Sequence, residues 1–131
     1  MREAINSPDY HVPIDGFSHA IRGRPGATPL FLSGLTARTV DGTIVAEGDV
    51  AGQLTQILEN MQAILSQAGA SLDDVVSIRT YILDIEKWDD LEPVMRRFWG
   101  DVWPASTLVE VRRLFDPRHL VEMESVALVY P

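Results

Sequence analysis

The sequence predicts an α/β fold, an α+β sandwich in which two helices cover one face of a sheet of about six strands. Two stretches carry apolar residues at helical spacing, and several shorter stretches are rich in β-branched residues and are bounded by glycine or proline. These elements follow in the order strands, helix, strand, helix, strands. With 131 residues and no internal repeat or linker, we expect a single domain over residues 1–131.

The longer helix is expected over residues 50–68. Asp49 is a favourable N-cap, and Gly69 is placed to end the helix. One stripe of this helix is apolar and needs a sheet to cover it; its members are Val50, Leu54, Ile57, Leu58, Met61, Ile64, Leu65 and Ala68.

A second helix is expected to begin near Asp89 or Asp90 and to end at Gly100. Pro93 supports this start, because proline is tolerated only in the first turn of a helix. Its apolar stripe consists of Leu91, Val94, Met95, Phe98 and Trp99.

The strands are predicted from β-branched runs between turn residues. A short edge strand and a loop are expected within residues 1–16, and a hairpin around Asp41-Gly42. The remaining strands are expected at residues 17–22, 30–33, 75–83, 106–111 and 121–129.

The strand at 75–83 has apolar residues on both of its faces. Simple alternation places Val76, Ile78 and Ile82 on one face and Val75, Tyr81 and Leu83 on the other. Two helices cover only one face of the sheet, so we expect the second face to pack against another subunit.

Composition excludes several classes of function. The net charge of −8 and the pI near 4.7 disfavour nucleic-acid binding. There is no cysteine, so no disulfide or thiolate nucleophile exists. Without an apolar run of about 20 residues or a secretory signal, we expect no membrane partner and a cytoplasmic location. The histidines show no metal-ligand spacing, and we expect neither a metal nor a cofactor.

The last quarter of the chain carries a family pattern. Pro104-Ala105 leads into Val109-Glu110-Val111, and Glu122 and Glu124 stand two residues apart in the last strand. Weaker matches appear in order along the chain; they are Ser33-Gly34, Asp41-Gly42, Gln53 with Asn60, Ala68-Gly69 and Asp74-Val75-Val76. Together they resemble the YjgF/RidA family of enamine and imine deaminases, also called endoribonuclease L-PSP-like proteins. The resemblance implies a chorismate-mutase-like fold and a homotrimer with ligand clefts between subunits.

The resemblance also implies which residues line the cleft. Glu122 matches the glutamate assigned to water activation, and Ser33 matches a cleft serine. Three other positions depart from the family: Phe17 replaces a tyrosine, Glu92 an asparagine, and Ser106 the arginine that holds the substrate carboxylate. A serine offers one donor and no charge where a guanidinium offers a fork of donors, so we expect weak activity on 2-imino acids. An alternative is that another arginine enters the cleft, from Arg22, Arg24, Arg38, Arg79 or Arg113, but we expect these five on the surface.

Two functions stay open from the sequence. The first is a deaminase-type hydrolase of an enamine or imine other than the usual short 2-imino acids, in which Glu122 directs water and Phe17, Ser33, Glu92 and Ser106 contact the substrate. The second is a non-catalytic trimer that binds a small molecule or a protein. An acidic start to a strand is also typical of a solvated strand end, in which case Glu122 and Glu124 have no chemical role.

Overall fold

The computed structural model describes residues 2–11 and 16–131. Part of the loop expected within residues 1–16 falls at positions 12–15, outside the described residues. The strands are β1 (Glu3–Ile5), β2 (Ala20–Arg22), β3 (Thr28–Leu35), β4 (Val75–Ile82), β5 (Ala105–Glu110) and β6 (Val121–Val129). The helices are α1 (Val50–Gln67) and α2 (Trp88–Trp99), with short 3₁₀ turns η1 (Leu72–Asp74) and η2 (Ile85–Lys87).

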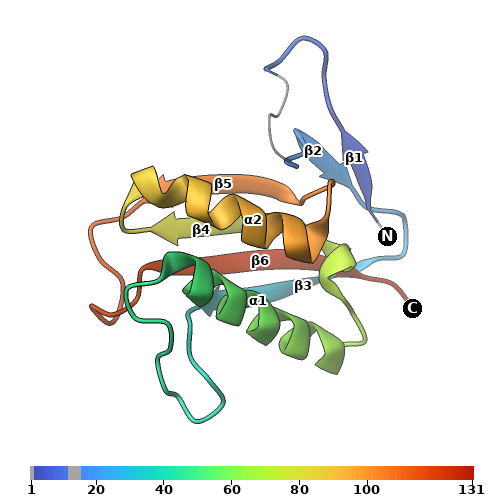
Figure 1. The fold of residues 1–131 in the computed structure, drawn as a ribbon. Coiled ribbons are helices and arrows are strands. Elements are labelled where there is room, and N and C mark those ends of the chain that lie inside the picture. Colours follow the sequence, from blue (N-terminus) through green and yellow to red (C-terminus); the bar gives the residue numbers. More distant parts are fainter. Residues whose placement is uncertain (1, 12–15) are drawn as a thin grey trace.

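The described strands form two sheets. β1 and β2 pair with each other and stand apart from the larger sheet, whose strand order is β3-β6-β4-β5 (Figure 1). β4 and β5 run parallel, and β6 is antiparallel to both β3 and β4. Both helices lie on the same side of this sheet (Figure 1). The predicted fold class, a sheet with two helices on one face, is confirmed, but the expected single sheet of about six strands is wrong, because β1 and β2 pair only with each other among the described strands.

Two predicted strands are shorter than the sequence suggested. β2 begins at Ala20, because residues 16–18 are held to another part of the chain, described below. The predicted 39–45 hairpin contains only the isolated bridge between Arg38 and Ile44. The turn is tight, because Thr39 N donates to Thr43 O at 2.9 Å and Gly42 has a φ of +87°. The residues on either side of this turn do not continue into a paired strand.

α1 begins and ends close to where the sequence placed its limits. The Asp49 side chain accepts a hydrogen bond from Gly52 N, which caps the first turn. Gly69 follows the helix with a φ of +70°, a conformation that favours glycine. The stripe is buried except at Ile64, which is 43% exposed, and at Ala68; both line a surface hollow beside β3.

α2 begins at Trp88, slightly earlier than predicted. Pro93 therefore lies in the second turn of the helix, so its predicted place in the first turn is wrong. The missing N–H of Pro93 would have bonded to the carbonyl of Asp89, and both residues are exposed. The solvent-facing side of α2 can accommodate the proline for this reason.

The sheet has one covered and one open face. The covered face carries buried residues of β4 and β6, among them Ile78, Ile82, Val121 and Met123. Val75 is also buried there, contrary to simple alternation, because a register shift between Val75 and Ser77 turns the start of β4 over. The open face carries Phe31, which is 76% exposed, together with Tyr81, Val109, Val126 and Leu128. The expectation of an apolar second face is therefore met in these described strands.

Candidate functional site

Glu122 lies on the open face of the sheet, against the backbone of β3. In the register of the sheet Glu122 stands opposite Tyr81. A Cβ added to Gly34 would lie 2.2 Å from Glu122 Oε2, so only a glycine at that position lets the carboxylate approach β3 so closely. The predicted residue Ser33 precedes Gly34 and is exposed. The fold thus places Ser33 beside the glycine on which Glu122 rests.

Glu124, the neighbouring carboxylate on the same strand face, contacts two other side chains. The hydroxyl of Tyr81 donates a short hydrogen bond to Glu124 Oε1, and Arg79 Nη1 lies 3.4 Å from the same oxygen. The hydrogen bond to Glu124 raises the pKa of Tyr81, which keeps this donor protonated. Glu124 is therefore a fixed, partly compensated negative charge.

Glu122 differs from Glu124 in both environment and contacts. Burial, and secondarily the charge of Glu124, raise the pKa of Glu122. Among the described residues no side chain forms a hydrogen bond or ion pair with Glu122. A carboxylate that lacks a partner and titrates above its usual range is suited to take and return a proton. We call Ser33, Gly34, Tyr81, Glu122 and Glu124 the carboxylate half-site.

The predicted residue Phe17 lies elsewhere, in a cluster of aromatic rings. Trp103 N donates to Gly16 O at 2.8 Å, and Ser18 Oγ donates to Trp103 O at 3.2 Å. These two hydrogen bonds hold residues 16–18 against Trp103. Phe17 stacks on Trp88, with ring centroids 5.5 Å apart, and meets Trp103 edge to face at 5.0 Å. This packing is the reason that residues 17–19 do not extend strand β2.

The predicted residue Glu92 lies one helical turn after Trp88 and is paired with an arginine. Arg96 Nε and Nη2 lie 2.8 Å and 2.7 Å from Glu92 Oε1, and Arg96 Nη1 lies 3.0 Å from Asp101 Oδ1. The guanidinium carbon of Arg96 stands 5.5 Å from the centroid of the Trp103 ring. Sequence reasoning did not consider Arg96. The i, i+4 spacing from Glu92 was the signal that could have found it.

Ser106 lies near this cluster but on the side of the sheet opposite Glu122. Its register partner is Ile78, a buried residue under the helices, whereas Glu122 pairs with Tyr81 on the open face. β5 and β3 also form opposite edges of the four-stranded sheet. We call Phe17, Trp88, Glu92, Arg96, Trp103 and Ser106 the aromatic half-site. One copy of the chain does not bring the two half-sites together.

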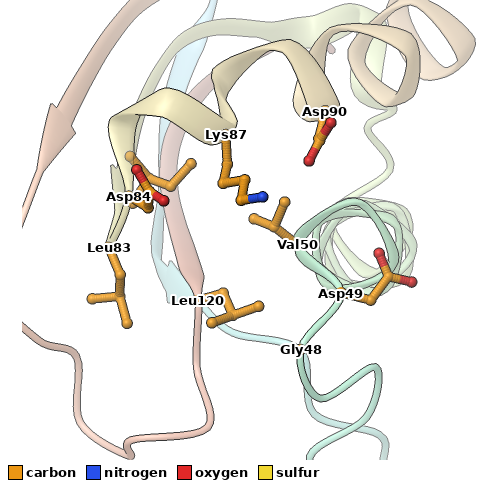
Figure 2. A pocket seen from close by; sticks show the side chains of 9 residues that line it. Gly48, Asp49, Val50, Leu83, Asp84, Lys87, Asp90 and Leu120 are labelled. Carbon is orange, nitrogen blue, oxygen red and sulfur yellow. The ribbon is translucent and has the colours of Figure 1, made fainter.

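A separate hollow of about 270 Å³ opens between the first turns of the two helices. Figure 2 shows Lys87 reaching across it toward Val50, with Asp49 and Asp90 on its rim. Asp49 caps α1, and Asp84 accepts a hydrogen bond from Glu86 N, so two of its carboxylates serve the backbone. None of the five predicted site residues lines this hollow.

The described histidines do not form a cluster of metal ligands. His19 Nδ1 accepts a hydrogen bond from Ser7 N at 2.9 Å, and His119 is buried. Within residues 2–11 and 16–131, no group of three or more His, Cys, Asp or Glu side chains is arranged to hold a metal ion. No helix in that part of the chain is long and apolar enough to span a membrane.

The fold and the half-sites define a small α/β protein whose open sheet face carries a carboxylate with no side-chain partner among the described residues. The family model for endoribonuclease L-PSP matches residues 8–129, so the chain belongs to this family, the YjgF/RidA family. A RutC family protein of Pyrococcus horikoshii is 34% identical over 128 residues, which cover 97% of this chain and 98% of that protein. A 2-iminobutanoate/2-iminopropanoate deaminase of Dermatophagoides farinae is 28% identical over 129 residues, covering 98% and 97%.

A solved structure is similar over almost the same length. It is a conserved Rid family protein of unknown function from Yersinia pestis, with a TM-score of 0.89, 29% identity and 98% coverage of both chains. The predicted family membership is confirmed, and with it the deaminase role of the family in general. The roles of Phe17, Ser33, Glu92, Ser106 and Glu122 stay predictions.

Proposed function

We propose that this protein is a deaminase-type hydrolase of small reactive imines and enamines. The observation that carries the proposal is Glu122, whose pKa is raised and whose carboxylate rests on Gly34 without a hydrogen-bonding partner among the described residues. Glu124 lies beside it and is held by Tyr81 and Arg79. Two neighbouring carboxyl groups with different environments are a common arrangement for acid and base roles. The similar deaminase from Dermatophagoides farinae supports the same class of reaction.

The proposed reaction replaces C=N by C=O with one water molecule. An enamine first becomes an imine by moving a proton from nitrogen to carbon. Glu122 then accepts a proton from water while the oxygen of the water forms a bond to the imine carbon. Glu122 passes this proton to nitrogen, which gives a carbinolamine. Glu122 then takes the proton of the new hydroxyl group and transfers it to the same nitrogen, so that C=O forms, the carbon–nitrogen bond breaks, and ammonia and a carbonyl compound leave. Glu122 is regenerated as a carboxylate at the end of each cycle.

A complete site needs a second copy of the chain. Ser106 and Glu122 face opposite sides of one sheet, on strands β5 and β6, and β4 lies between these two strands. In the proposed homotrimer, the carboxylate half-site of one subunit meets the aromatic half-site of its neighbour. The apolar residues exposed on the open face support this assembly.

The test is hydrolysis of 2-iminobutanoate, generated in the assay, by the wild type and by Glu122→Gln. Loss of a general base typically lowers the rate by about 10²- to 10⁴-fold, and we expect a decrease in kcat of this size. Glu59→Gln, an exposed glutamate on α1, is the matched control and should retain wild-type activity. Full activity in Glu122→Gln would exclude the proposed role of this residue.

The alternative is a non-catalytic trimer that binds a small molecule. The uncharged Ser106 favours it, because the arginine that holds the substrate in the family is missing at that position. If neither 2-iminobutanoate nor an imine without a carboxylate is hydrolysed faster than in buffer, this alternative replaces the enzyme. Nucleic-acid cleavage, which the family description names, is disfavoured by the net charge of −8.

A further inference from the structure

All three departures from the family, at Phe17, Glu92 and Ser106, lie in the aromatic half-site, and one arginine, Arg96, is bound directly by Glu92. We propose that Arg96 binds the carboxylate of the substrate in place of the arginine missing at Ser106, and that Glu92 is its positioning residue. This inference rests on the proposed function, because it states what the same site binds. In this proposal the anion contact moves from position 106 to Arg96, and Glu92 replaces an asparagine because it holds Arg96 in place.

The first reason is the location of Arg96. Its guanidinium stands over the ring of Trp103, 5.5 Å from the centroid. Ser106 follows Trp103 by three residues, a span of at most about 10 Å of extended chain. Ser106 faces the side of the sheet that is covered by the helices, and Arg96 comes from one of those helices. The charge removed at Ser106 is thus supplied from the adjacent helix.

The second reason is that the guanidinium is held in one orientation. Nε and Nη2 both contact Glu92 Oε1, at 2.8 Å and 2.7 Å, and the plane is further fixed against Trp103. The hydrogen bond to Glu92 raises the pKa of Arg96, which keeps it charged. An arginine that is already ordered loses little side-chain freedom when it binds an anion. Glu92 therefore acts through Arg96.

The third reason is that one end of the guanidinium is bound only weakly. Nη1 pairs with Asp101 at 3.0 Å, and the Asp101 side chain is 93% exposed. An ion pair with so exposed a partner contributes little to stability. A ligand carboxylate can therefore replace Asp101 at Nη1 while Glu92 continues to hold Nε and Nη2.

The neighbouring arginine shows that this arrangement is specific to one residue. Arg97 Nη2 donates to Thr55 Oγ1 at 3.1 Å, and its guanidinium carbon lies 5.1 Å from the centroid of the Phe98 ring. Arg97 is thus turned toward α1 and away from Trp103. It has the same charge on the same helix and provides a matched control.

The experiment measures binding without catalysis. The probe is 2-oxobutanoate, a keto acid of the class that the proposed reaction would release, and calorimetry gives its Kd for the full-length protein. Arg96→Gln should weaken binding by about 10- to 150-fold, as expected when a hydrogen-bonded charge is lost. Arg97→Gln should bind within about twofold of the wild type, because Arg97 lies outside the contact.

The uncharged amide of the same acid separates the anion contact from the rest of the site. It should bind equally to the wild type and to Arg96→Gln, since it carries no carboxylate. Thermal melting checks that each variant is folded, and Arg96→Lys, which keeps the charge but not the fork, should lose less affinity than Arg96→Gln. The proposal is overturned if the wild type does not bind 2-oxobutanoate, if Arg96→Gln binds like the wild type, or if Arg97→Gln loses as much.

The roles of Asp101 and Glu92 are tested in the same assay. Asp101→Asn removes the competing carboxylate and should leave binding unchanged or make it up to about fivefold tighter. Weaker binding would contradict the exchange at Nη1. Glu92→Ala should weaken binding in the wild type and have no further effect in Arg96→Gln. Equal losses in both backgrounds would overturn the positioning role of Glu92.

The outcomes distinguish this inference from the proposed function. One outcome is that the wild type hydrolyses no imine, while Arg96→Gln binds 2-oxobutanoate more weakly than the wild type does. The enzyme proposal then fails, and the anion contact is supported. If Glu122→Gln loses hydrolysis while Arg96→Gln keeps the KM of the wild type for 2-iminobutanoate, the enzyme is supported and the Arg96 contact is overturned.

Discussion

Two glycines decide how closely functional side chains approach the backbone. Gly34 has no side chain to displace the Glu122 carboxylate, and Gly16 leaves room for the ring of Trp103, which a Cβ would meet at 2.3 Å. The sequence marked Gly34 only as part of a family pattern. A glycine is needed at position 34 because Glu122 of β6, almost ninety residues later in the chain, lies against it. A prediction from neighbouring residues alone could not have found this contact.

Glu122→Gln should be more stable than the wild type at neutral to alkaline pH. The folded state raises the pKa of Glu122, so it binds this proton more tightly than the unfolded chain does, and an ionised Glu122 opposes folding. The wild-type disadvantage is therefore present above the folded pKa and disappears as the pH falls below the unfolded pKa. Melting temperatures of both proteins across pH 4–8 test this, and a Glu122→Gln protein that melts lower at pH 8 would contradict it.

At the scale of elements, α1 shows that helical periodicity predicts which residues are buried, with an exception near the edge of the sheet. The apolar stripe from Val50 to Leu65 packs against the sheet except at Ile64. Ile64 has the correct spacing but lies beside the edge strand β3, where the covered surface ends. The β-bulge at the start of β4 is a second case, because it reverses the face of Val75 without any proline or glycine to mark it.

Leu58→Ala should lower the free energy of unfolding by about 2–5 kcal/mol, because Leu58 is completely buried and the truncation leaves a cavity. Ile64→Ala, on the same helix and partly exposed, should cost markedly less. Urea denaturation of both variants provides the comparison. Equal losses would mean that the sheet covers a wider arc of α1 than the structure shows.

At the scale of the whole molecule, one face of the sheet is not covered by any helix of the same chain that the structure describes. Phe31 and Val109 are exposed there, and the partly buried Glu122 lies on the same face. A second copy of the chain would cover this face and also unite the half-sites. Assembly and function are therefore predicted to depend on each other.

Sedimentation equilibrium should give three times the chain mass of 14.6 kDa. Phe31→Asp, which places a charge on the open face, should shift the protein toward the monomer and lower its deaminase activity in parallel. Val40→Asp, at an exposed hairpin turn, is the control and should leave the mass unchanged. A wild-type protein that stays monomeric at low micromolar concentration would contradict the trimer and the shared cleft.

The sequence by itself determined the fold class, both helices, the strands β4 and β6, and the family. These features depend on local periodicity, capping residues such as Asp49, and the motif around Glu110 and Glu122, all of which are readable along the chain. Tertiary structure alone decided which candidates meet. It placed Ser106 and Glu122 on opposite faces, joined Phe17 to Trp88 and Trp103, and brought Arg96 over Trp103. Such contacts depend on strand register and on helix placement, which are set by packing between distant segments.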